Sequence, residues 1–548
     1  MRMSRRAPRL AALVAAGALL LTACSSGSDD ADGTTASDGG TSGSAVVTAN
    51  GTEPQNPLIP SNTNEVGGGK IIDLLYAGLV AYDADGAPHN EVAESIESDD
   101  NITWTVTLED GWTFTNGEPV DARSFVDAWN YGALLSNGHL SSYFFEPIVG
   151  YSQDEDSELT GLEVVDDLTF TVTLTSPLAD WPLRMGYSAY YPLPQVAYED
   201  MDAFGDAPIG NGQYMLDGDG WVHNVGVDLV PNPDYAGPRA PRNGGVSIRF
   251  YEQVDAAYND LLADQLDVLD QIPDTAFATF VDELGGRAVN QPAALNSTFT
   301  IGQFLPHFSG EEGRLRRAAI SMAIDRDEIT RTIFDGTRTP AVDFTSPAID
   351  GWSDSVPGNE VLRFDADRAR ELWAEADAIA PWEGTFTLAY NADGGHQVWV
   401  DAVTNGLRNV LGIDAEGQPF ATFAEARTEI TAAARGEAST LTGASRSGWQ
   451  ADYPGLFNFL GPIYGTGAGS NDGAYSNPEF DALLAEASSA DSLDEANALF
   501  EQAQAILLED LPAIPLWYQN AVGGYSTLVD DVQFGWNQVP LLYQVTKS

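Results

Sequence analysis

The chain has 548 residues, of which 43% are hydrophobic and 10% aromatic, a composition typical of globular proteins. It carries 81 acidic and 25 basic side chains, and its formal net charge of −56 excludes nucleic acid as a partner, because phosphates would be repelled. A single hydrophobic core stops growing at about 250 to 300 residues, so we expect two or three lobes.

The first 24 residues carry an export signal. A start with four arginines leads to an apolar run over residues 10–21, which is shorter than the ~20 residues that a membrane-spanning helix needs. Leu21, Thr22 and Ala23 then stand before Cys24, the only cysteine in the chain. These residues resemble the lipobox of bacterial lipoproteins, which implies that residues 1–23 are a signal peptide and that lipid on Cys24 anchors the protein to the cell membrane, outside the cytoplasm. The alternative is an unpaired thiol beside an ordinary cleavage site.

The next segment, residues 24–44, predicts a disordered tether. After Cys24 it consists of Ser, Gly, Asp, Thr and Ala, and it lacks the large apolar side chains that a folded core needs. Without the four arginines of the leader the net charge is −60, an acidity that we interpret as a source of solubility.

Simple patterns predict the start of the folded body. Residues 45–49 are a β-branched run that favours a strand, and residues 51–61 are a loop rich in Pro and Asn. Apolar residues then recur at helical spacing and predict a helix over residues 70–82. The acidic turn at residues 83–86 lacks the later ligands of a calcium loop, so we expect no metal there.

The following section combines strands and turns in a distinctive order. Ala93-Glu94-Ser95 leads to an alternating strand over residues 104–108, and an acidic turn leads to a second strand at residues 112–114. The turn Asn116-Gly117-Glu118-Pro119 then precedes a helix over residues 121–129. This order resembles the signature of the family-5 extracellular solute-binding proteins, the oligopeptide- and dipeptide-binding components of ATP-driven importers.

The resemblance continues over most of the chain, from residue 45 to residue 544. The matching segments are an alternating strand at 164–174, a return turn at 208–214, an amphipathic helix at 315–326, a helix entry at 475–481 and a returning strand at 512–518. In the return turn, Asn211 and Gln213 replace the Thr and Pro that the family usually has, a departure that we expect to affect the turn and not the function.

The resemblance implies an α/β fold of the periplasmic-binding-protein type (type II, cluster C) with three lobes. Lobe I would combine residues 45–75, 190–290 and 512–548. Lobe II would comprise residues 76–189 and lobe III residues 291–511. Ligand would be enclosed in a hinged cleft between lobes I and III.

The segment from Arg446 to Pro454 concentrates recognition chemistry. We expect it to be extended, with Gly448 and Pro454 at its two ends. Arg446 suits a carboxylate and Asp452 suits an ammonium, while Trp449 offers apolar area between them, so the segment could hold a zwitterion such as a peptide. The alternative is an ordinary strand corner with a core Trp and solvated charges.

The resemblance implies a role for each part of this segment. In oligopeptide binders of the family, the residue at Asp452 pairs with the α-ammonium of the peptide. The backbone from Ser447 to Gln450, which includes Gly448, adds the peptide as an extra strand beside Trp449, and Arg446 can meet a carboxylate.

Three further residues are candidates for ligand contacts by the same resemblance. His396 falls where some oligopeptide binders contact the C-terminal carboxylate, although a lone His is more often structural. Asn62 and Thr63 lie in the loop where the family pairs its facing lobe with the ligand.

We therefore expect a substrate-binding lipoprotein of an ABC importer. It would be a monomer without cofactor or metal, and it would deliver peptides to permease and ATPase subunits. Other solutes of the family, such as oligosaccharides, nickel complexes, haem or opines, are alternatives. A secreted peptide hydrolase is a weaker one, since neither His-Glu-x-x-His nor Gly-x-Ser-x-Gly occurs, and we expect no enzyme.

Cys24→Ser is expected to release the folded body into the soluble fraction while leaving its ligand affinity unchanged, because only the lipid anchor is lost. Fractionation of cells followed by immunoblotting measures this. Membrane association equal to that of the wild type would contradict lipidation.

Overall fold

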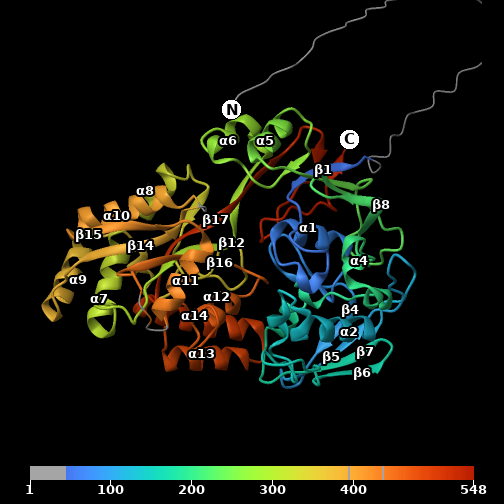
Figure 1. Cartoon of the computed structure of the whole chain (residues 1–548), viewed down its shortest axis with the longest axis horizontal. Coiled ribbons are helices and arrows are strands. Elements are labelled where there is room, and N and C mark those ends of the chain that lie inside the picture. The colour runs from blue at the N-terminus through green and yellow to red at the C-terminus, as the bar shows by residue number, and fades with distance from the viewer. Residues whose placement is uncertain (1–44, 393–394, 435–436, 438, 548) are drawn as a thin grey trace, which may run out of the picture. The chain divides into compact units, whose positions relative to one another are not determined.

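The computed structural model describes residues 45–547 apart from residues 393–394, 435–436 and 438 (Figure 1). The expected signal peptide, Cys24 and the tether lie outside the described residues. None of the helices in the described part of the chain is both long and apolar enough to cross a membrane.

An eleven-stranded mixed sheet forms the framework of the described residues (Figure 1). Its strands follow the order β15-β14-β16-β12-β17-β11-β1-β10-β9-β8, and β13 pairs with β17 beside this path. Their bounds are β1 Val47–Gly51, β8 Tyr214–Val222, β9 Gly226–Pro231, β10 Val246–Phe250, β11 Val268–Leu269, β12 Ala288–Thr300, β13 Arg338–Pro340, β14 Thr385–Asn391, β15 Asp414–Phe420, β16 Ala444–Gln450 and β17 Ala513–Tyr525.

Two 13-residue strands, β12 and β17, connect the two ends of this sheet. They pair antiparallel with each other over most of their length, with a register shift between Pro292 and Asn296. β16 pairs with the second half of β12, whereas β11 pairs with the last residues of β17. The strands from β14 to β16 and those from β8 to β11 are thus joined through one pair of long strands.

Helices and three small sheets complete the described structure. The helices before residue 290 are α1 Val66–Leu75, α2 Ala122–Ala133, α3 Trp181–Arg184, α4 Met201–Asp206, α5 Val254–Leu262 and α6 Phe280–Leu284. The later helices are α7 Gly310–Met322, α8 Arg326–Thr332, α9 Ala366–Ile379, α10 Gln397–Leu411, α11 Phe423–Ala434, α12 Leu456–Tyr464, α13 Pro478–Ser488 and α14 Leu493–Asp510. Two of the small sheets have two strands each: β2 Val80–Tyr82 pairs with β3 Pro88–Asn90, and β18 Val529–Asp530 pairs with β19 Thr546–Lys547. The third has four strands in the order β4-β5-β7-β6, with the bounds β4 Ala93–Glu97, β5 Thr103–Leu108, β6 Leu162–Asp166 and β7 Thr169–Thr173.

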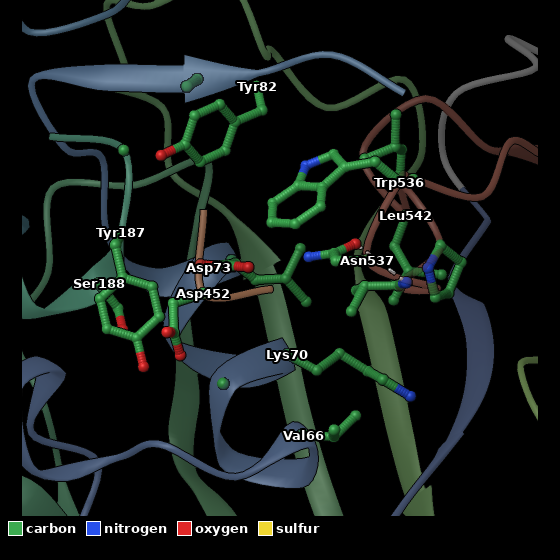
Figure 2. A pocket seen from close by; sticks show the side chains of 18 of the residues that line it. Val66, Lys70, Asp73, Tyr82, Tyr187, Ser188, Asp452, Trp536, Asn537 and Leu542 are labelled. Atoms are coloured by element: carbon green, nitrogen blue, oxygen red, sulfur yellow. Dashed lines mark hydrogen bonds between the residues drawn. The ribbon is translucent and has the colours of Figure 1, made fainter. Parts of the chain in front are cut away.

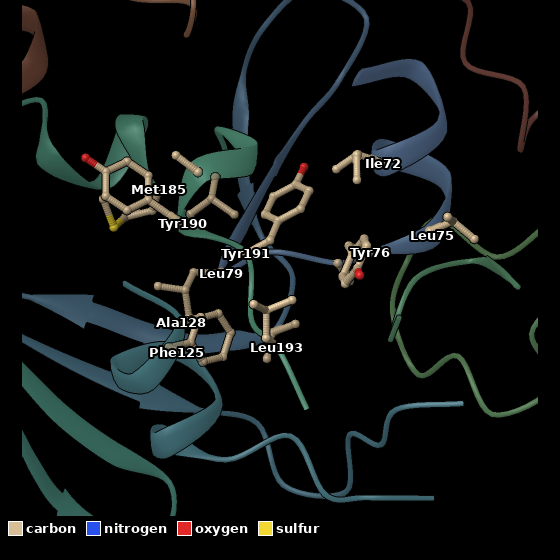
Figure 3. Packing of buried hydrophobic residues seen from close by; sticks show 14 of the residues in the cluster. Ile72, Leu75, Tyr76, Leu79, Phe125, Ala128, Met185, Tyr190, Tyr191 and Leu193 are labelled. Carbon is tan, nitrogen blue, oxygen red and sulfur yellow. The ribbon is translucent and has the colours of Figure 1, made fainter. Parts of the chain in front are cut away.

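Two large hydrophobic clusters stabilise these elements. The first core contains side chains of α1, α2, β5, β7 and the segment 185–193, and Figure 3 shows several of them packed together. The indole N–H of Trp129 in α2 donates to the carbonyl oxygen of Tyr190 at 2.9 Å, which fixes that segment. The second core contains side chains of α7, α9, α10, α12, α13 and α14.

The helix expected over residues 70–82 is wrong in its bounds, because α1 spans Val66–Leu75 and a strand follows. The Glu65 side chain accepts a hydrogen bond from the Gly68 N–H at 2.7 Å, so the helix begins on its glycines despite their low helix propensity. It ends where Ala77 is held by Asn211, whose amide accepts from the Ala77 N–H at 3.0 Å and donates to the Ala77 carbonyl at 2.9 Å. Periodicity alone did not reveal this long-range stop.

Three other expected elements also differ from those in the structure. The single strand expected at residues 164–174 is the hairpin of β6 and β7, because the Asp166 carboxylate accepts from the Leu168 N–H and makes a turn. The second strand expected at 112–114 is only an isolated bridge between Thr113 and Pro119. The helix expected at 315–326 ends at Met322, and the Asp325 side chain caps α8.

Asn211→Ala is expected to lower the free energy of unfolding by about 2 kcal/mol or more, because it leaves the buried N–H and C=O of Ala77 without partners. Urea unfolding followed by tryptophan fluorescence measures the change. Asn405→Ala, at an exposed position of α10, is the matched control and should stay within about 0.5 kcal/mol. Equal effects of the two substitutions would contradict the role of Asn211.

Candidate ligand-binding site

A cavity of about 430 Å³ lies between segments from distant parts of the chain (Figure 2). Its volume is in the range of small-ligand sites, roughly 300 to 1,000 Å³. The lining comes from α1 and the loop before it, from β2 and the following turn, from Gln213 and Arg239, and from the segments 186–191, 450–452 and 535–543. The segment singled out from the sequence therefore reaches this cavity with its last residues.

The strand before these residues, β16, has one free edge. It pairs with β12 from Ser445↔Thr300 to Gln450↔Leu295, whereas its pairing with β14 stops at Ser445. Among the described residues, no strand pairs with the other edge of residues 446–450. The extended run begins at Ala444 and not at Gly448, where a Cβ atom would come within 2.6 Å of the Asn296 carbonyl oxygen.

Asp452 follows β16 and is held by Asn458, a buried residue of α12. The Asn458 amide donates to the Asp452 carboxylate at 3.0 Å and accepts from the Asp452 backbone N–H at 3.0 Å. It also accepts from the indole N–H of Trp449 at 2.8 Å. One amide thus fixes the carboxylate relative to the end of the strand.

The electrostatic setting of Asp452 favours a positively charged ligand. Burial raises the pKa of Asp452 to about 6, against the opposing hydrogen bond from Asn458. Within the described residues, no ion pair involves this carboxylate. The two cations that line the cavity are already used, since Lys70 pairs with Asp270 and Arg239 pairs with Glu91.

Tyr453 ties this segment to the first core. Its hydroxyl donates to the Asp180 carboxylate at 3.2 Å, and Asp180 pairs with Arg184 at 3.0 Å. The guanidinium of Arg184 lies 5.2 Å from the centre of the Tyr453 ring. The residue after Asp452 is therefore anchored to Asp180 and Arg184.

The structure brings three of the eight candidate ligand residues to the cavity, namely Thr63, Gln450 and Asp452. Gln450 is exposed at the end of β16, whereas the Thr63 hydroxyl donates to the Ile59 carbonyl oxygen at 2.9 Å inside the protein.

The other five candidates lie outside the cavity lining. Arg446, Gly448 and Trp449 belong to β16, and Trp449 acts through Asn458 as described above. His396 lies just before α10 and accepts a hydrogen bond from the Trp399 indole at 3.2 Å. Asn62 ends a short 3₁₀ turn and accepts from the Leu140 N–H at 3.2 Å.

Sequence reasoning missed several residues of the cavity. Asp73, Gln213 and Arg239 line it from the first half of the chain, and Trp536 lines it from the last. Trp536 belongs to an irregular segment without periodicity, and its carbonyl oxygen accepts from the Ala294 N–H of β12 at 2.7 Å. The one signal in the sequence that could have pointed to Asp73 is its position one helical turn after Lys70 in the expected helix. Gln213 stands where the family usually has Pro, and we expected this departure to affect only a turn. In the structure its side chain is buried and lines the cavity.

Among the described residues, no group of three or more His, Cys, Asp or Glu side chains is arranged to hold a metal ion. The lining combines the positioned carboxylate of Asp452, Gln450 at the end of β16 and aromatic side chains such as Tyr82, Tyr187 and Trp536.

Comparison with known proteins gives this geometry a context. The family model described as bacterial extracellular solute-binding proteins, family 5 Middle, matches residues 87–471. The chain is 27% identical over 531 residues to the periplasmic oligopeptide-binding protein OppA of Salmonella typhimurium, covering 88% of this chain and 89% of the relative.

Solved structures of this kind share the fold. The unliganded open form of MppA, a periplasmic murein tripeptide binding protein, superimposes with a TM-score of 0.77 at 23% identity, over 92% of this chain and 97% of that one. OppA of Haemophilus influenzae in complex with the peptide RPPGFSPFR gives a TM-score of 0.69 at 23% identity, over 92% of this chain and 99% of that one. The expected α/β fold of the type II periplasmic binding proteins is confirmed.

Asn458→Leu is expected to raise the pKa of Asp452 above about 6, by about one unit or more, because the carboxylate loses a hydrogen bond that favours its charged form. An NMR titration of ¹³C-labelled aspartate carboxyl carbons, with the Asp452 signal assigned by Asp452→Asn, measures the pKa. Asn405→Leu, at an exposed position of α10, is the control and should leave the pKa of Asp452 unchanged. An unshifted pKa in Asn458→Leu would contradict the assigned hydrogen bond.

Proposed function

The chain belongs to the bacterial extracellular solute-binding proteins of family 5, and on that premise we propose that it captures extracellular peptides in the cavity beside Asp452. The observation that carries this proposal is the positioned carboxylate of Asp452, which lines the cavity without an ion-pair partner among the described residues. The α-ammonium group is the cation that every unmodified peptide offers.

The pairing of Asp452 with an ammonium group has a physical basis. In the cavity the carboxylate is partly desolvated, which is why its pKa is raised to about 6. A bound cation would remove this penalty, and the Asn458 amide already holds the carboxylate in place. Binding energy would therefore be gained without reorganising the site.

The free edge of β16 supplies the second part of the proposal. Residues 446–450 pair with β12 on one side only, so an extended peptide can add as a strand on the other. Main-chain hydrogen bonds are the same for every peptide, which permits a broad range of side chains. Arg446 and His396 are proposed to meet the peptide carboxylate, and Asn62 and Thr63 to contact the ligand from the facing side.

The transport role follows from the family. Its members are solute-binding proteins and not enzymes, and the Salmonella relative is described as a periplasmic oligopeptide-binding protein. We propose that this protein is a monomer, that lipid on Cys24 anchors it to the membrane, and that it delivers peptides to the permease and ATPase subunits of an importer. Lobe I (residues 45–75, 190–290 and 512–548) and lobe III (residues 291–511) would close on the peptide, with lobe II (residues 76–189) beside them.

Asp452→Ala is expected to weaken the binding of free-amine peptides at least about a hundredfold, since a buried charge left alone costs about 3 to 5 kcal/mol. Peptides acetylated at the N-terminus should bind the wild type poorly and lose little more on mutation. Isothermal titration calorimetry of both peptides with both proteins forms a double-mutant cycle that isolates the contact.

Asp85→Ala is the control for this experiment, because Asp85 is exposed in the nearby turn and should leave both affinities unchanged. Wild-type affinity of Asp452→Ala for both peptides would mean that Asp452 is a solvated loop acid. Binding of a sugar or a metal complex, with no binding of either peptide, would overturn the peptide proposal.

A further inference from the structure

A second carboxylate, Asp73 of α1, lines the same cavity. It is half-buried, and the Tyr191 hydroxyl donates to one of its oxygens at 3.1 Å. Within the described residues, no ion pair involves Asp73, and no other hydrogen bond to its carboxylate is formed. Burial raises the pKa of Asp73, and the nearby positive charge of Arg239 only opposes this effect.

Both cations near Asp73 are neutralised by other acids. Arg239 binds Glu91 in a bidentate pair, with N–O distances of 2.8 and 2.6 Å. Lys70 stands one helical turn before Asp73, but its ammonium group pairs with Asp270 and donates to the Asn50 carbonyl oxygen at 2.9 Å. Figure 2 shows the Lys70 side chain extending away from Asp73. The charge of Asp73 is therefore left unmatched in the cavity.

Asp73 and Asp452 come from segments nearly 380 residues apart in the chain and line the same cavity. Tyr187 lines the cavity, and Figure 2 shows its ring on the same side as both carboxylates. Burial raises the pKa of Tyr187, and the charges of Asp452 and Asp73 raise it further, so its hydroxyl lies within electrostatic reach of both. A ligand placed beside this ring would face two acids.

We infer that Asp73 is a specificity-determining residue, which binds a basic first side chain of a peptide whose α-ammonium group is paired with Asp452. The inference rests on the proposed function. The α-ammonium and the first side chain leave from the same carbon atom, so a cation on a flexible side chain would remain near Tyr187 and within the cavity. The face of the Tyr187 ring would add a cation–π contact.

The test compares Lys-Ala-Ala with norleucine-Ala-Ala, which has the same side-chain carbons but no ammonium group. Isothermal titration calorimetry should give an affinity for Lys-Ala-Ala that is at least about tenfold higher in the wild type, as expected for a paired charge in a partly desolvated site. Asp73→Asn should reduce this preference to less than about twofold while retaining the affinity for norleucine-Ala-Ala. Asp85→Asn removes one negative charge from an exposed turn and should keep the preference.

The outcomes separate the inference from the function on which it rests. Equal wild-type affinities for the two peptides, or a full preference for Lys-Ala-Ala in Asp73→Asn, would overturn the role of Asp73 and leave peptide capture intact. Binding of neither peptide, with capture of a non-peptide solute, would overturn the proposed function and the inference with it. The wild-type comparison needs no variant, so equal affinities for the two peptides would overturn the role of Asp73 even if Asp73→Asn fails to fold.

Discussion

The antiparallel pairing of β12 with β17 is the constraint on which the described structure depends. Strands on either side of this pair belong to separate stretches of the sequence, and each of the two large cores packs against one part of the sheet. β12 also carries β16 along its second half, and Ala294 of β12 binds the backbone of Trp536. The cavity segments around Gln450 and Trp536 are therefore both hydrogen-bonded to β12. This shared strand explains how two segments that are far apart in the sequence keep a defined separation.

A second constraint is electrostatic. The cavity contains cations and acids, but the cations are consumed by internal pairs with Asp270 and Glu91. Asp73 and Asp452, two of the acids that line the cavity, form no ion pair among the described residues, and the charges of both raise the pKa of Tyr187. Buried charges need a partner, so such an arrangement is stable only while the acids are protonated, hydrated or bound to a cation.

The order of strands and turns around Trp104 and Trp112 resembles the signature of family 5, and this resemblance implied the fold class. The sequence also led to Asp452, which lines the cavity in the structure, since an acid after a Trp and a short extended run is visible in one segment. Asn458, Asp73 and Trp536 could not be identified this way. Asn458 lies only six residues after Asp452, but no motif marks its amide as the partner of that carboxylate. The contacts of Asp73 and Trp536 join segments that are remote in the chain, and no periodicity in a single sequence reports them. The end of α1 was missed for the same reason. The Asn211 amide, which binds the backbone of Ala77 just after this helix, lies 134 residues away from Ala77 in the chain.

The anchoring of Tyr453 on Asp180 and Arg184 has a consequence for changing the specificity of this site by directed evolution. Because that contact holds the residue next to Asp452, substitutions in α3 would alter the cavity without touching a ligand, and would confound a search for new binders. A library that keeps Asp180, Arg184, Tyr453 and Asn458 constant, and varies the lining residues Val66, Gln450 and Asn537, would sample ligand preference on an intact scaffold.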